Sequence, residues 1–200
     1  MLLLKSKQKI LAAILREPGI HVNALMKIVG SVRDIKSVLN ELEEANLIRS
    51  KYVGNIRQLF PILNNRLSIS TFELAEEQEK INAALNFPIV KKLINRINSF
   101  KKIFGSQLVS VALFGSVARG HLTKTSDVDI LFIVKKEDVA HKNKLIKMIQ
   151  TISINVGREV MPMVIEKKEF KKQLNLDGSF AKQVQRERII LYNVREFLLL

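Results

Sequence analysis

The sequence predicts an α+β protein with two domains: N-terminal helices that end in a β-hairpin, and a C-terminal mixed sheet flanked by helices. The first third of the chain contains three apolar stripes at helical spacing, followed by two strand-like runs. In the second half, apolar β-rich runs alternate with helix-forming segments. With 200 residues, of which 47% are hydrophobic, each domain can form its own core. We expect domains at residues 1–66 and 105–200, joined by a helical connector at 67–104.

The composition favours a polyanionic partner. The chain has 33 Lys and Arg against 19 Asp and Glu, a formal charge of +14, and cations that neutralise phosphates release condensed counterions. A solvated basic surface would give the same composition. There are no cysteines, which excludes disulfides and thiolate zinc sites. The apolar run at residues 1–4 is too short for a signal peptide or a membrane helix, so we predict a cytoplasmic protein without a membrane partner.

Three short helices are predicted near the N-terminus. The first ends before Pro18-Gly19, because these residues cannot continue a helix cheaply. The second covers residues 22–29, and the third buries an apolar face within residues 35–42. Ser31 and Asp34 fit a capping box, so we expect the third helix to begin at Gly30-Ser31.

Two strand-like runs, 47–53 and 56–60, follow on either side of Gly54-Asn55, a dipeptide that suits a tight hairpin. Three helices and a hairpin in this order resemble the winged helix-turn-helix domains of prokaryotic regulators over residues 5–63. The resemblance implies that the third helix enters the major groove of DNA and that the hairpin is the wing. The DNA-binding residues that it implies are Arg33, Lys36 and Ser37 on the helix, and Lys51 and Arg57 on the wing. A protein-protein interaction module of the same fold is the alternative.

The connector is rich in helix formers and predicts one or two long helices over residues 64–106. Asn86-Phe87-Pro88 is expected to break them, since a proline disfavours the helical conformation in the residue before it. The first of these helices could form a homodimer interface, an arrangement common among proteins that bind twofold symmetric operator sites.

A strand-to-helix turn in the C-terminal half suits phosphate binding. The apolar run 108–114 leads into Gly115-Ser116 and a stretch that can form one helical turn. Gly115 lets a phosphate approach the backbone, and Ser116 adds a hydroxyl donor. Glycine and serine alone are a weak signal, because the pair ends many strands that bind nothing.

Ser126-Asp127-Val128-Asp129 opens a second apolar strand, 130–134. The two-residue spacing points both carboxylates to the same face of the strand. Two like charges so close favour a cation between them, and hard oxygen ligands suit Mg²⁺. A solvated strand end with two incidental acids is the alternative interpretation.

The segment Leu113-Phe114-Gly115-Ser116-Val117-Ala118-Arg119-Gly120, followed by Ser126-Asp127-Val128-Asp129-Ile130, resembles the DNA polymerase β-like nucleotidyltransferase superfamily, most closely its small prokaryotic members. The resemblance covers residues 100–195. It implies a nucleoside triphosphate, for which we expect ATP, and one or two Mg²⁺ ions held by Asp127 and Asp129. It also implies in-line attack of an acceptor hydroxyl on the α-phosphorus, with pyrophosphate leaving. The nucleotide-binding residues that it implies are Gly115, Ser116, Arg119 and Ser126. The acceptor could be a protein, a nucleic acid or a small molecule.

Active members of that superfamily usually carry a third carboxylate on a later strand. The matching strand is predicted at 158–165, and its middle carries Met161 where an acid is expected. Glu159 lies two residues earlier on the same face and is the candidate third catalytic acid. Pro162 indicates an edge strand or a bulge. A closing helix at 180–184 and a strand at 187–192 complete the predicted domain.

Three functional hypotheses follow. The first is a Mg²⁺-dependent nucleotidyltransferase joined to a DNA-binding domain. The second is a regulator of transcription whose degenerate nucleotidyltransferase domain binds nucleotide or a partner without turnover, which the missing acid favours. The third makes the N-terminal domain a protein-interaction module that docks the acceptor.

Overall fold

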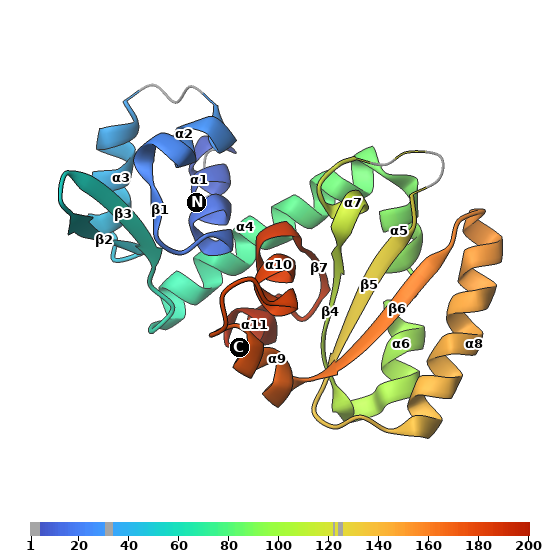
Figure 1. Cartoon of the computed structure of the whole chain (residues 1–200). Coiled ribbons are helices and arrows are strands. Elements are labelled where there is room, and N and C mark those ends of the chain that lie inside the picture. The colour runs from blue at the N-terminus through green and yellow to red at the C-terminus, as the bar shows by residue number, and fades with distance from the viewer. Residues whose placement is uncertain (1–4, 31–33, 122, 124–125) are drawn as a thin grey trace. The chain divides into compact units, whose positions relative to one another are not determined.

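The computed structural model describes residues 5–30, 34–121, 123 and 126–200 (Figure 1). The chain divides into two compact units, Met1–Gln78 and Glu79–Leu200. The boundary falls inside the long helix α4, Arg66–Asn86. The finer three-part division expected from the sequence stays a prediction. Among the residues described, no helix is both long and apolar enough to cross a membrane.

The first unit combines helices with a three-stranded antiparallel sheet in the order β1-β3-β2. The predicted helices and hairpin are present, and Val53 pairs with Ile56 across the hairpin turn. The short strand β1 was not predicted. Apolar side chains of all three helices are buried in the core, among them Ile14, Leu25 and Leu39. The elements are α1 Lys5–Arg16, β1 Ile20–His21, α2 Val22–Val29, α3 Ile35–Glu44, β2 Ile48–Val53 and β3 Ile56–Pro61.

Helix α3 begins later than the sequence suggested. Its N-cap is Asp34, which has a left-handed backbone (φ +56°) and whose carboxylate accepts the Ser37 N–H at 3.2 Å. The predicted start at Gly30-Ser31 is therefore wrong. Asp34 satisfies an open N–H group by itself, as aspartates at helix starts commonly do. Ser31 and Arg33 lie outside the described residues.

Three helices follow the hairpin: α4, α5 (Pro88–Ile94) and α6 (Ile97–Phe104). The predicted break is confirmed, because Phe87 is extended and Pro88 takes the first position of α5, where its missing N–H costs nothing. The further break between α5 and α6 was not predicted.

The second unit contains a four-stranded mixed sheet in the order β6-β5-β4-β7. Strand β4 runs antiparallel to β5 and β7, while β5 and β6 are parallel and joined through α8, Val139–Val156. Pro162 lies in β6, which is an edge strand as predicted. The strands are β4 Leu108–Phe114, β5 Val128–Val134, β6 Val160–Glu166 and β7 Ile189–Tyr192.

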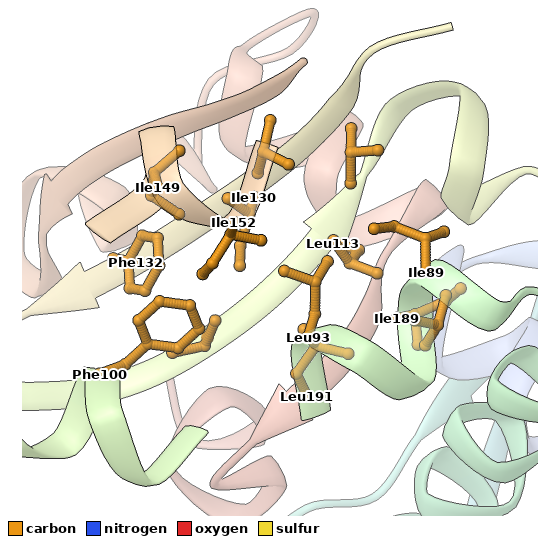
Figure 2. Packing of buried hydrophobic residues seen from close by; sticks show 14 of the residues in the cluster. Ile89, Leu93, Phe100, Leu113, Ile130, Phe132, Ile149, Ile152, Ile189 and Leu191 are labelled. Carbon is orange, nitrogen blue, oxygen red and sulfur yellow. The ribbon is translucent and has the colours of Figure 1, made fainter. Parts of the chain in front are cut away.

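Helices α5, α6 and α8 cover one face of this sheet and share its main apolar cluster (Figures 1 and 2). Phe132 of β5 contacts the rings of Phe100 and Phe104 from α6. Alternate β5 residues, including Val128 and Ile130, point into the cluster. Because side chains alternate along a strand, Asp129 points to the other face of the sheet. Near that face lie α9 (Lys167–Gln173), α10 (Phe180–Glu187) and α11 (Val194–Leu198). The short helix α7 (Gly115–Ala118) follows β4 and buries Val117 in the main apolar cluster.

Candidate active site

The Gly115-Ser116 turn lies directly against an aspartate of the neighbouring strand. Phe114, the last residue of β4, pairs with Asp129 of β5, and helix α7 begins at the next residue. Gly115 has φ +71°, and a Cβ there would lie 2.3 Å from Asp129 Oδ2. Glycine is therefore required twice, by the backbone conformation and by the close approach of the carboxylate.

The two predicted aspartates share this neighbourhood. Asp127 is exposed just before β5, and Asp129 is half-buried inside it. Burial raises the pKa of Asp129, and the Asp127 charge raises it further, while the Arg119 guanidinium lowers it. The site thus holds negative charge that favours a bound cation. Two carboxylates are a typical protein contribution to a Mg²⁺ site, with phosphates and water supplying other ligands. Among the described residues, no group of three or more His, Cys, Asp or Glu is arranged to hold a metal.

The two serines of the motif make hydrogen bonds to the backbone close to Asp127. The Ser116 hydroxyl donates to the Asp127 carbonyl at 3.4 Å, which joins the turn to the start of β5. The Ser126 hydroxyl accepts the Thr123 N–H at 3.0 Å. Arg158 donates to the Thr123 and Ser126 carbonyls at 2.6 and 3.3 Å. These contacts fix the backbone just before Asp127.

Glu187 also lies in the site, although no sequence pattern predicted it there. Its Oε2 accepts the Gly115 N–H at 3.2 Å and pairs with Arg119 Nη1 at 2.7 Å. The Glu187 side chain is 18% exposed, and its charge adds to the rise in the pKa of Asp129. The predicted strand at 187–192 began too early, because Glu187 is the last residue of α10 and β7 begins at Ile189.

The position of Glu187 follows from strand pairing. Strand β7 is antiparallel to β4, with Ile189 opposite Leu113. A residue just before β7 is therefore brought beside the turn that follows β4. An acid at the end of an amphipathic helix was the only local signal, and it gains meaning only once this pairing is known.

Met161 lies at the β6 position where a third carboxylate was expected. The parallel register pairs Asp129 with Met161, so the two side chains lie on one face, and Met161 is 46% exposed. Glu159 precedes β6, and its carbonyl accepts the Val128 N–H at 3.0 Å. Glu159 is exposed, and together with residues of α8 it lines a cavity of about 940 Å³. Its catalytic role stays a prediction.

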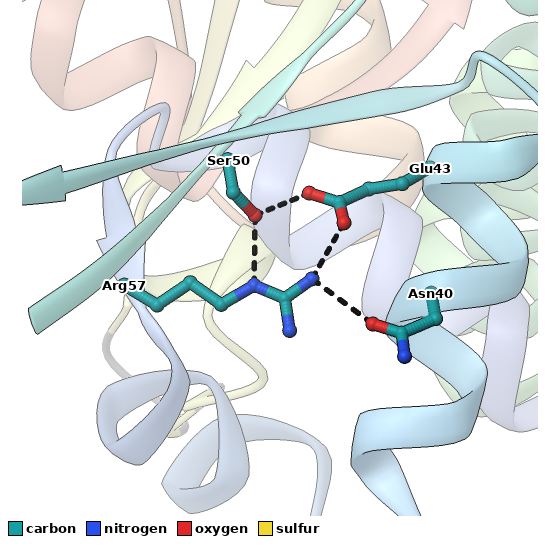
Figure 3. A network of polar contacts seen from close by, with 4 residues as sticks. All are labelled: Asn40, Glu43, Ser50 and Arg57. Carbon is teal, nitrogen blue, oxygen red and sulfur yellow. Dashed lines mark hydrogen bonds and ion pairs between the residues drawn. The ribbon is translucent and has the colours of Figure 1, made fainter.

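The residues predicted to contact DNA have different surroundings. Arg57 pairs with Glu43 at 2.7 Å and donates to the Ser50 hydroxyl at 2.8 Å and to Asn40 at 3.4 Å (Figure 3). The Ser50 hydroxyl also donates to Glu43. This network joins α3 to both strands of the hairpin. Lys36 and Ser37 of α3 and Lys51 of β2 are exposed. Lys36 and Arg57 line one groove of about 630 Å³ between α3 and the hairpin.

The mixed sheet and its flanking helices are consistent with the fold of nucleotidyl-transferring domains. Residues 90–191 match the family described as nucleotidyltransferase domain. The match covers just over half of the chain, which therefore belongs to this family.

Curated relatives extend this result. The spectinomycin 9-adenylyltransferase of Staphylococcus aureus is 36% identical over 74 residues, which are 36% of this chain and 28% of that protein. Two Methanocaldococcus jannaschii proteins, each named "Putative protein adenylyltransferase", are 36% identical over 81 residues and 31% over 96. Those alignments cover 38% and 48% of this chain, and 82% and 90% of the relatives. The comparisons support nucleotidyl transfer in general.

Proposed function

We propose that this protein transfers AMP from ATP to an acceptor hydroxyl, with Mg²⁺ held by Asp127 and Asp129. One observation carries the proposal: the Asp129 carboxylate lies against Gly115 of the turn, with exposed Asp127 beside it. Hard carboxylate oxygens next to a glycine turn suit a metal-bound triphosphate. The adenylyltransferase names of the relatives favour ATP over other nucleotides.

In the proposed reaction the acceptor oxygen forms a bond to the α-phosphorus, and the bond from that phosphorus to pyrophosphate breaks. Bound Mg²⁺ would stabilise charge on the phosphate oxygens. Ser116 and Arg119 hold the triphosphate in line for attack. Met161 takes the β6 position expected for a third carboxylate, so the proton of the acceptor hydroxyl passes to Glu159 or to water. Chemistry without that general base is slower by roughly 10²- to 10⁴-fold.

Glu187 regulates the binding of the triphosphate to two donors, the Gly115 N–H and the Arg119 guanidinium. The Glu187 carboxylate accepts the Gly115 N–H and pairs with Arg119, and in the proposed complex the triphosphate contacts both groups. Nucleotide binding therefore displaces Glu187. Until then, the carboxylate keeps Arg119 neutralised beside the turn.

The test uses the full chain. Calorimetry measures the affinity for a non-hydrolysable ATP analogue with and without Mg²⁺, and α-labelled ATP reports transfer to separate pools of proteins, RNA and small molecules. We expect Mg²⁺-dependent binding and labelling, and both should be lost in the double variant Asp127→Asn, Asp129→Asn. Asp177→Asn is the matched control, because that carboxylate is 98% exposed and pairs with Lys182. The proposal would be refuted if nucleotide affinity were the same with and without Mg²⁺ and the same in the double variant.

A second function concerns the first unit. We propose that it is a winged helix-turn-helix that binds DNA through α3 and the hairpin, because Lys36 borders the groove between them and Lys51 is exposed on β2. Lys36→Ala with Lys51→Ala should then weaken DNA binding without changing nucleotide affinity. The methionine at position 161, where an acid was expected, favours the regulator hypothesis, in which ATP binds without turnover. ATP-dependent DNA affinity in the absence of any labelling would support that alternative.

A further inference from the structure

Acidic residues are missing from one entire helical layer of the second unit. No Asp or Glu occurs in residues 80–126 or 139–158. We call α5, α6 and α8, with the Asn95-Arg96 turn, the cationic helical layer. All of its lysines and arginines are exposed: Lys91, Lys92, Arg96, Lys101, Lys102, Lys142, Lys144 and Lys147. The acids of the second unit all lie outside the layer.

These charges share one surface. All three helices pack on the same sheet face through side chains such as Leu93, Phe100 and Ile149 (Figure 2), and α6 contacts α8. Their outward sides therefore face solvent together. Asp129 points to the opposite face of the sheet, so the layer lies apart from the triphosphate site.

The layer also has a concave feature. A groove of about 570 Å³ lies between the α5–α6 turn and the C-terminal part of α8. Lys92, Asn95 and Arg96 line one side, and Asn155 contributes from α8. Lys92 Nζ donates to the Asn155 carbonyl at 3.4 Å, which holds the ammonium group at the groove. Lys, Arg and Asn side chains in a groove are suited to phosphate oxygens and sugars.

The chemistry favours a duplex nucleic acid over other polyanions. Like charges on fixed helices repel, and regularly spaced phosphates relieve that repulsion while counterions are released. The aromatic residues Phe100 and Phe104 are buried, and the layer exposes no Phe, Tyr or Trp within its fully described helices. It therefore lacks the stacking platforms of single-strand binders and the interfacial aromatic anchors typical of membrane surfaces.

We propose that the cationic helical layer is a nucleic-acid docking surface, separate from the first unit, that binds a duplex backbone without reading its sequence. The proposal goes beyond nucleotidyl transfer and holds whether or not transfer is found.

The experiment measures fluorescence anisotropy of a labelled mixed-sequence duplex, prepared as DNA and as RNA, over a range of salt concentrations. The full chain carries Lys36→Ala and Lys51→Ala to reduce binding by the first unit. The layer variant adds Lys91→Gln, Lys102→Gln and Lys147→Gln, one lysine from each helix. The matched control instead adds Lys168→Gln, Lys171→Gln and Lys172→Gln on α9, which packs against α10. Both variants lose the same charge.

We expect the layer variant to bind at least about tenfold more weakly at low salt, with a salt slope smaller by about 2 to 3. The α9 control should stay within about twofold of its parent, and arginines at the three layer positions should retain binding. Thermal melting of each variant shows whether folding is intact. Comparing the two duplexes identifies whether DNA or RNA is preferred.

Three outcomes would overturn the proposal. Equal losses in the layer variant and the α9 control would show only a net-charge effect. Single strands that bind as tightly as duplexes would exclude backbone docking of a duplex. Binding to vesicles of phosphatidylserine and phosphatidylcholine through the same lysines, without duplex binding, would make the layer a membrane surface.

Discussion

Two arginines, Arg57 in the first unit and Arg119 in the second, were both expected to contact phosphates, and each pairs with a glutamate at 2.7 Å. Their surroundings differ. Arg57 is 17% exposed and has two further side-chain partners, Ser50 and Asn40. Arg119 is 44% exposed, and its glutamate also accepts a backbone N–H of the glycine turn.

From this difference we infer that Arg57 acts mainly in the fold and that Arg119 can exchange its partner for a ligand. The guanidinium of Arg57 joins three elements of the first unit, so a phosphate would have to replace several bonds at once. The Arg119 guanidinium pairs with Glu187 and is more exposed than that of Arg57. A phosphate of a ligand can therefore replace Glu187 at a lower cost in free energy. Four predictions test this difference, beginning with the largest effect.

Arg119→Gln should lower kcat/KM for AMP transfer by roughly 100- to 1,000-fold, because a positioned cation stabilises charge that develops in the transition state. Steady-state kinetics with labelled ATP measures the effect. Stability should change by no more than about 1 kcal/mol, because the guanidinium is 44% exposed and water screens its ion pair. Arg186→Gln, an exposed arginine of α10, is the control. A loss of stability with unchanged kinetics would make Arg119 structural like Arg57.

Arg57→Gln should lower the free energy of unfolding by about 1 to 3 kcal/mol, because it removes the charged partner of the half-buried Glu43 and the donor to the Ser50 hydroxyl. Urea unfolding of the full chain measures this loss, and nucleotide affinity should stay constant. The control is Lys51→Gln on the same hairpin. Weaker DNA binding at unchanged stability would show instead that Arg57 is a phosphate contact.

Glu187→Gln should tighten Mg²⁺-ATP binding by roughly tenfold, about 1.4 kcal/mol, because it removes a negative charge from the triphosphate position. The amide oxygen can still accept the Gly115 N–H, so the fold should be kept. Calorimetry provides the measurement, with Glu169→Gln on α9 as the control. If affinity falls, Glu187 positions Arg119 and does not compete with the nucleotide.

Asp129→Asn should stabilise the metal-free protein at neutral pH. The folded-state pKa of Asp129 is raised by burial and then by Asp127, so ionising it costs stability as pH rises through that pKa. The advantage of the variant should shrink as pH falls toward 3.8, the ordinary value of the group. Urea midpoints between pH 4 and pH 7 would reveal this trend.

Asp177→Asn is the control of opposite sign. The hydrogen bond from Lys182 lowers the pKa of Asp177, so its ionised form stabilises the fold above the ordinary value, and this contribution is lost as pH falls through the lowered pKa. Its replacement should reduce stability at neutral pH. Parallel pH trends in the two variants would contradict the assignment of Asp129.

Elements set by local chemistry were predicted well. The apolar run 108–114 coincides with β4, the break falls at Phe87, and Pro162 lies on an edge strand. Proline, turn glycines and apolar periodicity act within a few residues, so they can be recognised without knowing the fold. The start of α3 was missed because two nearby residues could cap it, and Asp34 takes that role.

The sequence by itself determined the family, the glycine-serine turn, the spacing of Asp127 and Asp129, and the excess of positive charge. Only the tertiary structure decided that Glu187 reaches Gly115, that Met161 lies beside Asp129, and that the acid-free helices share one sheet face. Local patterns report what a segment prefers over one or two turns. They do not report which distant strand it pairs with, and that pairing placed these side chains together.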